Sequence, residues 1–161
     1  MRNLSKSPSQ RTALILKDVP GKGRGVFAGQ MFRPGDEVLQ FLGDLQDVTT
    51  FSDLTHALQV GPTAFLGPSG ELDDYVNHSC DPNCGIRDDN GRVVLFALKP
   101  IGEGHEISFD YATTQAGGFW KMTCQCGAPI CRGTIGDFSD MPKGRQDFFV
   151  KKQAVLPYLV K

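Results

Sequence analysis

Three of the five cysteines in this 161-residue chain stand within eight residues, in the segment Cys124-Gln125-Cys126-Gly127-Ala128-Pro129-Ile130-Cys131. Two thiols one residue apart and a third five residues later can face one ion across a Gly-Pro turn. A structural zinc site takes four ligands, so a remote thiol must complete the set, and the sequence offers Cys80 and Cys84. The alternative is free thiols, which we disfavour because unpaired exposed cysteines are reactive.

A second segment, Asn77-His78-Ser79-Cys80-Asp81-Pro82-Asn83, consists of residues whose side chains bind ligands, hydrogen-bond locally or fix turns. Such a run has little to bury in an apolar core. An Asx-rich turn with one incidental histidine is the plain alternative.

The glycine-rich loop of residues 21–25 leads into a predicted strand. Walker and Rossmann loops instead need a helix N-terminus to hold phosphate, so we disfavour phosphate binding. Alternating glycines allow a main chain to approach a ligand closely. A simple hairpin turn is the alternative.

The fourth segment, residues 106–111, is a predicted strand that ends in Phe109, Asp110 and Tyr111. A core strand with the tyrosine hydroxyl at its rim would explain it equally well. His56 and His105 have no companion ligands at metal spacing, so we interpret both as ordinary surface or hydrogen-bonded histidines.

The elements that must position these segments are short. Asp89-Asn90-Gly91 is a strong hairpin signal, and residues 67–70 are a weaker one. Apolar spacings of three and four predict two helical turns over 51–58, with a strand as the alternative, and a helix interrupted by Pro157 follows Met141. The predicted strands are residues 13–16, 25–28, 37–42, 92–98 and 106–111 among about seven in all, so the fold class is mainly β.

Composition limits the function. The chain has 17 basic and 18 acidic residues, so no global charge draws it to nucleic acid or to a membrane surface. With 40% apolar residues it can bury a core as one domain. Five is an odd number of cysteines, and we find neither an apolar leader nor a run of about 20 apolar residues. We therefore expect an intracellular protein without a disulfide framework.

In this order, the four segments resemble the SET-domain protein-lysine methyltransferases with a post-SET cysteine motif. The resemblance covers roughly residues 12–136. It implies a mainly β fold of small curved sheets around a knot-like crossing, in which residues 77–83 lie beside the strand ending at Tyr111. We divide the chain into a disordered polar tail (1–11), a SET domain (12–114), a post-SET zinc segment (115–136) and a partly helical C-terminal extension (137–161).

The resemblance also implies an activity, the transfer of methyl groups from S-adenosylmethionine to the ε-amine of a lysine in a protein, with a histone tail as the family's expected substrate. It places Tyr111 at the reacting centre. Its fourth zinc ligand corresponds to Cys80, which leaves Cys84 out. The implied site residues are Phe41, Tyr75 and Phe109 for the lysine channel; Lys22, Gly23, Arg24, Asn77, His78, Tyr111 and Trp120 for the cofactor; and Cys80, Cys124, Cys126 and Cys131 for structural Zn²⁺.

Two positions depart from the family pattern. Phe41 stands where many members have tyrosine, and Thr134 stands where several have a bulky apolar residue over the adenine, a role that Phe119 or Trp120 could take. A catalytically silent zinc-containing interaction domain is the main alternative function. A zinc-ribbon nucleic-acid binder is disfavoured because the chain has no basic stripe.

The expected partner is a protein with a basic, lysine-containing segment, without direct nucleic-acid or membrane binding. Acidic residues between positions 71 and 89 would suit such a partner, and a solvated polar loop explains them equally well. We expect the nucleus if the source is eukaryotic and the cytoplasm if it is bacterial.

Overall fold

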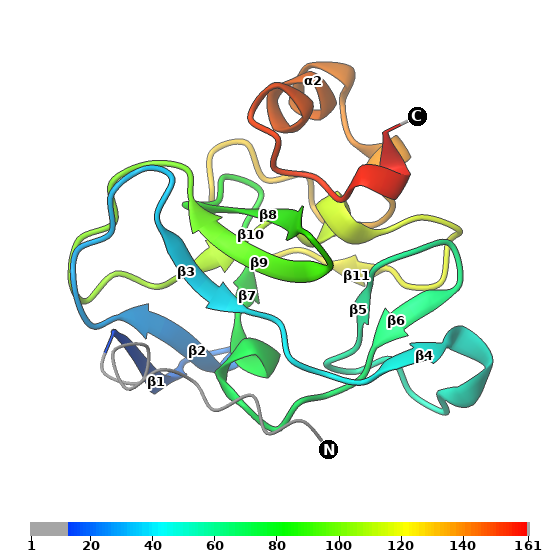
Figure 1. The fold of residues 1–161 in the computed structure, drawn as a ribbon. Helices are drawn as coiled ribbons and strands as arrows, with labels where there is room; N and C mark the ends of the chain where they lie inside the picture. Colours follow the sequence, from blue (N-terminus) through cyan, green and yellow to red (C-terminus); the bar gives the residue numbers. More distant parts are fainter. Residues whose placement is uncertain (1–12, 161) are drawn as a thin grey trace.

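A computed structural model describes residues 13–160, and these form small sheets arranged around one main apolar core (Figure 1). The predicted tail, residues 1–11, lies outside the described residues. The strands are β1 (Leu14–Val19), β2 (Gly23–Ala28), β3 (Glu37–Gln40), β4 (Leu45–Asp47), β5 (Leu58–Gln59), β6 (Ala64–Leu66), β7 (Asn77–His78), β8 (Cys84–Asp89), β9 (Arg92–Ala97), β10 (Ser108–Phe109), β11 (Met122–Thr123) and β12 (Thr134–Ile135). The mainly β prediction is confirmed.

The sheet β3-β9-β8 lies at the centre of the molecule in Figure 1, with the hairpin β1-β2 and the sheet β4-β6-β5 on either side. β9 is its most apolar strand, and Val94 and Leu95 are fully buried. The predicted hairpin turn between β8 and β9 is confirmed. Asn90 and Gly91 have φ angles of 52° and 86°, values that asparagine and glycine tolerate at a tight turn.

β7 and β10 are two-residue strands that pair in parallel, with Asn77 opposite Ser108 and His78 opposite Phe109. The predicted contact between these two segments is therefore present. The predicted strand over 106–111 extends too far. It ends at Phe109 because the Asp110 carboxylate accepts a hydrogen bond from the Ala112 N–H and caps a 3-10 helix, Tyr111–Thr114.

Two other sequence predictions are wrong. Residues 51–57 form no helix, because the Asp53 carboxylate binds both the N–H and the hydroxyl of Thr55, and His56 takes a left-handed φ of 61°. Residues 67–70 form no hairpin turn. They connect β6 to a 3-10 helix, Leu72–Tyr75, and are held by the Asp74 carboxylate, which accepts from the N–H groups of Ser69 and Gly70.

The C-terminal extension contains the predicted helix, α2 (Lys143–Lys151), at the top of Figure 1. Phe149 is fully buried in a second apolar cluster that includes Phe96 from β9. Pro157 does not interrupt the helix, since it begins a separate 3-10 helix, Pro157–Leu159. Short 3-10 helices also cover Val48–Thr50 and Phe138–Asp140. None of the helices within residues 13–160 has the length and apolar character to cross a membrane.

Candidate active site and metal centre

Tyr111 lies where the main apolar core meets the cysteine cluster, which consists of Cys80, Cys124, Cys126 and Cys131 with Ile135. Its side chain packs against both. Its hydroxyl donates to the Val76 carbonyl at 2.6 Å, and its ring centroid is 4.9 Å from that of Phe109. Burial, reinforced by the negative charge of Glu106, raises the pKa of Tyr111 above its ordinary value. The side chain is therefore a neutral phenol whose orientation is fixed and whose oxygen can still accept a hydrogen bond.

A cavity of about 330 Å³ opens beside Tyr111. Phe41 and Phe109 meet edge to face in its wall, with ring centroids 5.6 Å apart. Of the predicted site residues, Phe41, Phe109, Tyr111 and Trp120 line it. Tyr75, which we also predicted, does not line this cavity. Its ring lies 5.6 Å from that of His56 and 6.0 Å from the Arg24 guanidinium. Sequence reasoning missed further wall residues, among them Leu54, Leu58, Phe65, Leu66 and Met122.

Three acidic residues between positions 71 and 89, Asp73, Asp88 and Asp89, have local hydrogen-bond partners. Asp73 lines the cavity, but its carboxylate accepts from the Leu42 N–H and the Ser69 hydroxyl. Asp88 and Asp89 belong to the β8-β9 hairpin, where they bind the Gly91 N–H and Arg92. These four contacts stabilise local structure, and they favour the interpretation of the acidic segment as a polar loop.

The glycine-rich loop reaches the segment that begins at Asn77. The Asn77 amide donates to the Arg24 carbonyl at 2.9 Å and to the Glu106 carboxylate at 2.7 Å. A Cβ at position 25 would lie 2.5 Å from that carboxylate and 3.0 Å from the Asn77 nitrogen, so a larger residue there would displace both side chains from this contact. Lys22, Gly23, Arg24, Asn77 and His78 are thus brought together. Glu106 was missed.

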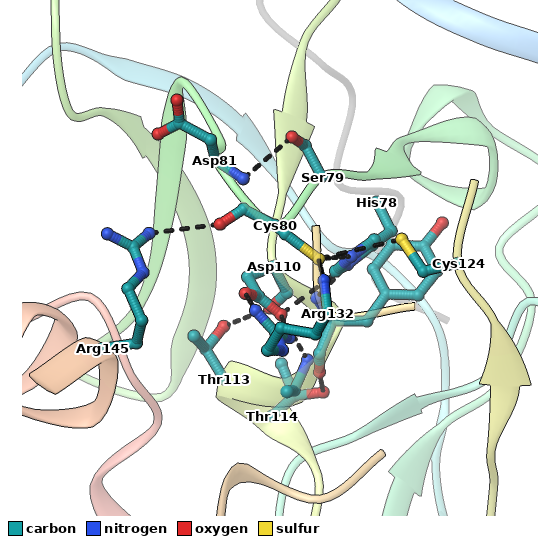
Figure 2. A network of polar contacts seen from close by, with 12 residues as sticks. His78, Ser79, Cys80, Asp81, Asp110, Thr113, Thr114, Cys124, Arg132 and Arg145 are labelled. Atoms are coloured by element: carbon teal, nitrogen blue, oxygen red, sulfur yellow. Dashed lines mark hydrogen bonds and ion pairs between the residues drawn. The ribbon is translucent and has the colours of Figure 1, made fainter. Parts of the chain in front are cut away.

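Four potential metal ligands converge within 4.8 Å of one another: His78, Cys80, Cys124 and Cys126. The Cys80 and Cys124 sulfurs are 3.7 Å apart, and Figure 2 shows them facing each other beside His78. Cys131 lies at the edge of the same cluster, with its sulfur 3.9 Å from the Cys124 carbonyl oxygen. Thus the structure brings the three predicted cysteines of the tail to Cys80 and adds His78.

Hydrogen bonding decides what the His78 ring can offer. The Tyr111 N–H donates to Nδ1 at 3.0 Å, so Nδ1 must be unprotonated. Burial lowers the pKa of His78 to about 4, which keeps the ring neutral near pH 7 and places its proton on Nε2. Nε2 lies 3.3 Å from the Cys80 sulfur. It is therefore a donor to that sulfur and has no lone pair for a metal, which leaves Cys131 as the fourth ligand candidate.

The thiols differ in acidity. Burial by itself would raise the pKa of Cys126, but hydrogen bonds from the N–H groups of Cys80 and Ala128 and from the Cys124 and Cys131 thiols together lower it to about 6. Burial alone raises the pKa of Cys84 to about 12, and this thiol lies in the main apolar core. Burial also raises the pKa values of Cys80 and Cys124. Their sulfurs lie 3.7 Å apart beside Cys126, however, so these thiols and not Cys84 can share a zinc ion.

Comparison with known proteins gives a consistent result. Residues 23–112 match the family described as SET domain. The histone-lysine N-methyltransferase Set2 of Drosophila melanogaster is 32% identical over 142 residues, which are 78% of this chain and 6% of that protein. The chain therefore spans a small part of this relative's length.

Solved structures share the fold. A crystal structure of KRYPTONITE in complex with mCHG DNA and SAH superposes with a TM-score of 0.66 at 25% identity, covering 78% of this chain and 29% of that chain. A second KRYPTONITE structure, with mCHH DNA, an H3(1–15) peptide and SAH, has a TM-score of 0.63 at 23% identity and covers 78% of this chain and 31% of that one.

Proposed function

The chain belongs to the SET-domain family, and on that premise we propose that it transfers methyl groups from S-adenosylmethionine to the ε-amine of a lysine in a protein substrate. One observation carries the proposal. Tyr111 stands at the wall of an aromatic cavity with its hydroxyl oriented by Val76, and its backbone N–H binds His78 in the segment that meets the glycine-rich loop. A side chain entering the cavity would thus meet a fixed phenol.

S-adenosylmethionine would supply an already activated methyl group on a sulfonium. We assign its binding to the main chain of residues 22–24, to Asn77, His78 and Tyr111, and to Trp120, whose ring centroid is 6.0 Å from that of Tyr111. The contact of the Asn77 amide with Arg24 orients the remaining amide oxygen, which can accept from an ammonium group.

The residues of the chain have three tasks in this reaction. Phe41 and Phe109 exclude water from the channel, the Tyr111 oxygen orients the amine, and burial disfavours the charged form of a lysine whose solution pKa is about 10.4. We assign no carboxylate of the described cavity wall as a base, since the sulfonium is already an activated donor. Asp73 and Asp74 on that wall both accept hydrogen bonds from Ser69.

We assign a structural zinc ion to Cys80, Cys124, Cys126 and Cys131. The ion would tie the post-SET segment to the segment that carries Tyr111, without entering the chemistry. Its ligands would come from two parts of the chain, the residues just after β7 and the stretch between β11 and β12. The metal would thus replace apolar packing that so short a stretch cannot provide.

A histone tail is the substrate we propose, since the Drosophila relative is named a histone-lysine methyltransferase and a KRYPTONITE structure contains an H3 peptide. A nuclear location follows if the source is eukaryotic, and a cytoplasmic one if it is bacterial. Both KRYPTONITE structures contain DNA, so the absence of direct nucleic-acid binding stays a prediction for this chain, and a gel-shift titration would check it.

The test is incubation with an isotopically labelled methyl donor and a panel of basic proteins that includes core histones. We expect label on a lysine of one panel member, and none with the Tyr111→Phe variant. Calorimetry of the methyl donor should show binding by both proteins. A wild-type chain that binds no methyl donor and labels no protein would overturn the proposal.

A further inference from the structure

Arg132 follows Cys131, the last cysteine of the post-SET segment, and it contacts both Cys80 and Asp110, the residue before Tyr111. Its guanidinium makes two parallel bonds to the Asp110 carboxylate, at 2.7 and 2.8 Å, and its backbone N–H donates to the Cys80 sulfur at 3.4 Å (Figure 2). We propose that Arg132 is a positioning residue that transmits the state of the metal centre to Tyr111.

The first step is the isolation of the ion pair from water. The side chain of Asp110 is 0% exposed and that of Arg132 is 13% exposed. Solvent therefore screens the pair very little, and removing one partner would leave the other buried and uncompensated. The bidentate geometry also fixes the distance and angle between the two segments, which a single contact would not do.

The second step is what Asp110 does besides binding Arg132. The same carboxylate accepts from the Ala112 N–H at 3.1 Å, and the Asp110 carbonyl accepts from the Thr113 N–H at 3.0 Å. These bonds begin the 3-10 helix, of which Tyr111 is the first residue. The position of Asp110 thus sets the backbone direction at Tyr111.

The third step is a parallel connection through His78. The Tyr111 N–H binds Nδ1 of this ring, and Nε2 donates to the Cys80 sulfur. Both connections from Tyr111 therefore end at the same sulfur, one through the ring of His78 and one through Asp110 and Arg132. A thiolate bound to a metal holds its place and accepts both N–H donors, whereas a released Cys80 would free both connections together.

This inference rests on the proposed function only where it concerns methyl transfer, so its main test uses measurements that need no methyl donor. In Arg132→Lys the charge remains but the bidentate contact is lost. The matched control is Arg92→Lys, since Arg92 makes a similar pair with Glu37, at 2.6 and 3.3 Å, but is 42% exposed and lies on β9.

With the zinc-loaded full chain, we expect Arg132→Lys to release zinc to a chromogenic chelator about tenfold faster than wild type, which is the usual scale for residues that support metal ligands. Amide hydrogen exchange at residues 110–115, followed by mass spectrometry, should rise in wild type after chelation. In Arg132→Lys it should already be raised with zinc bound. Arg92→Lys should match wild type in both measurements.

Asp110→Asn provides a second variant with nearly the same shape, and its effects should not add to those of Arg132→Lys because both changes break one contact. If methyl transfer is established, both variants should lower kcat more than they raise KM for the peptide. Zinc release and exchange at 110–115 that equal those of wild type in both variants would overturn the inference, whatever the chain proves to catalyse. Exchange that rises on chelation only at 122–135 would overturn it too.

Discussion

Cys80 and Cys84 are four residues apart and both are 0% exposed, yet they stand in opposite kinds of interior. Cys84 begins β8 inside the main apolar cluster, where burial alone raises the pKa of its thiol to about 12. Cys80 belongs to the cysteine cluster, where the ring of His78, the Arg132 N–H and the Cys124 thiol all approach its sulfur. The same residue type is a small apolar filler in one place and a candidate ligand in the other.

The comparison teaches that the degree of burial does not distinguish a structural thiol from a metal-binding one. What distinguishes them is the number of donors and thiols directed at the sulfur. Tyr111 lies at the boundary between these two interiors and Phe109 packs against it from the apolar side, so variants there test how far each interior extends.

The largest effect should come from replacing each of the two sulfurs, in turn, by the oxygen of serine. Cys80→Ser should remove zinc and nearly all methyl transfer, because a hydroxyl is a poor ligand for this ion. Cys84→Ser should keep one zinc per chain and lose roughly 1–3 kcal/mol of stability from a hydroxyl buried in an apolar site. Metal analysis and thermal unfolding of both variants would show this, and metal loss in Cys84→Ser but not in Cys80→Ser would reverse the comparison.

The second comparison is within the metal centre. Cys131→Ser should lose zinc, whereas His78→Gln should keep the stoichiometry because Nε2 of His78 is a donor to sulfur rather than a ligand. A glutamine amide can still donate to Cys80. Metal content after extensive dialysis checks both variants. Zinc retained by Cys131→Ser and lost from His78→Gln would assign the fourth position to the histidine.

Tyr111→Phe should lower catalysis without disturbing the metal centre or the cofactor site. Methyl transfer should fall on the order of 10²-fold or more, because the hydroxyl lies at the proposed reacting centre. Zinc content should not change, and cofactor affinity should stay within a few-fold. Asn77→Ala should instead weaken cofactor binding directly. Calorimetry and single-turnover rates distinguish the two variants, and full turnover by Tyr111→Phe would show that the centre lies elsewhere.

The smallest change in total rate should come from Phe109, which is buried in the apolar cluster but faces Tyr111. We expect wild type to add two or three methyl groups, since a phenylalanine here holds no water in the space that a further methyl needs. Phe109→Tyr should stop chiefly at one. Mass spectrometry of a peptide at long incubation checks this, and a wild type that stops at monomethyl-lysine would contradict it.

The sequence predicts those parts of the fold and of the candidate site that are determined by residues close together in the chain. Asn90 and Gly91 encode their own turn, and the spacing of the tail cysteines defines their own cluster. The helix predicted over 51–58 failed because a side-chain bond from Asp53 to Thr55 competes with helical hydrogen bonds, and three apolar residues do not outweigh it.

The role of Arg132 could not be predicted from the sequence. Its partner is an aspartate 22 residues earlier, and an arginine after a cysteine has no pattern that indicates a buried carboxylate. The same holds for the His78 ring, because its tautomer depends on a backbone N–H 33 residues away. Local patterns identified the candidate segments, and only their packing shows which atoms face one another.

These long sequence separations have a consequence for how the chain folds. The turn between β8 and β9 joins near neighbours, while Cys80 meets Cys124 across 44 residues and Arg132 across 52. Contacts between distant residues require long loops to close first, so they form late. We expect the β8-β9 hairpin to form before the cysteine cluster. A newly made chain would then hold a nearly complete sheet before its thiols could capture a metal, and in that interval they would be open to oxidation.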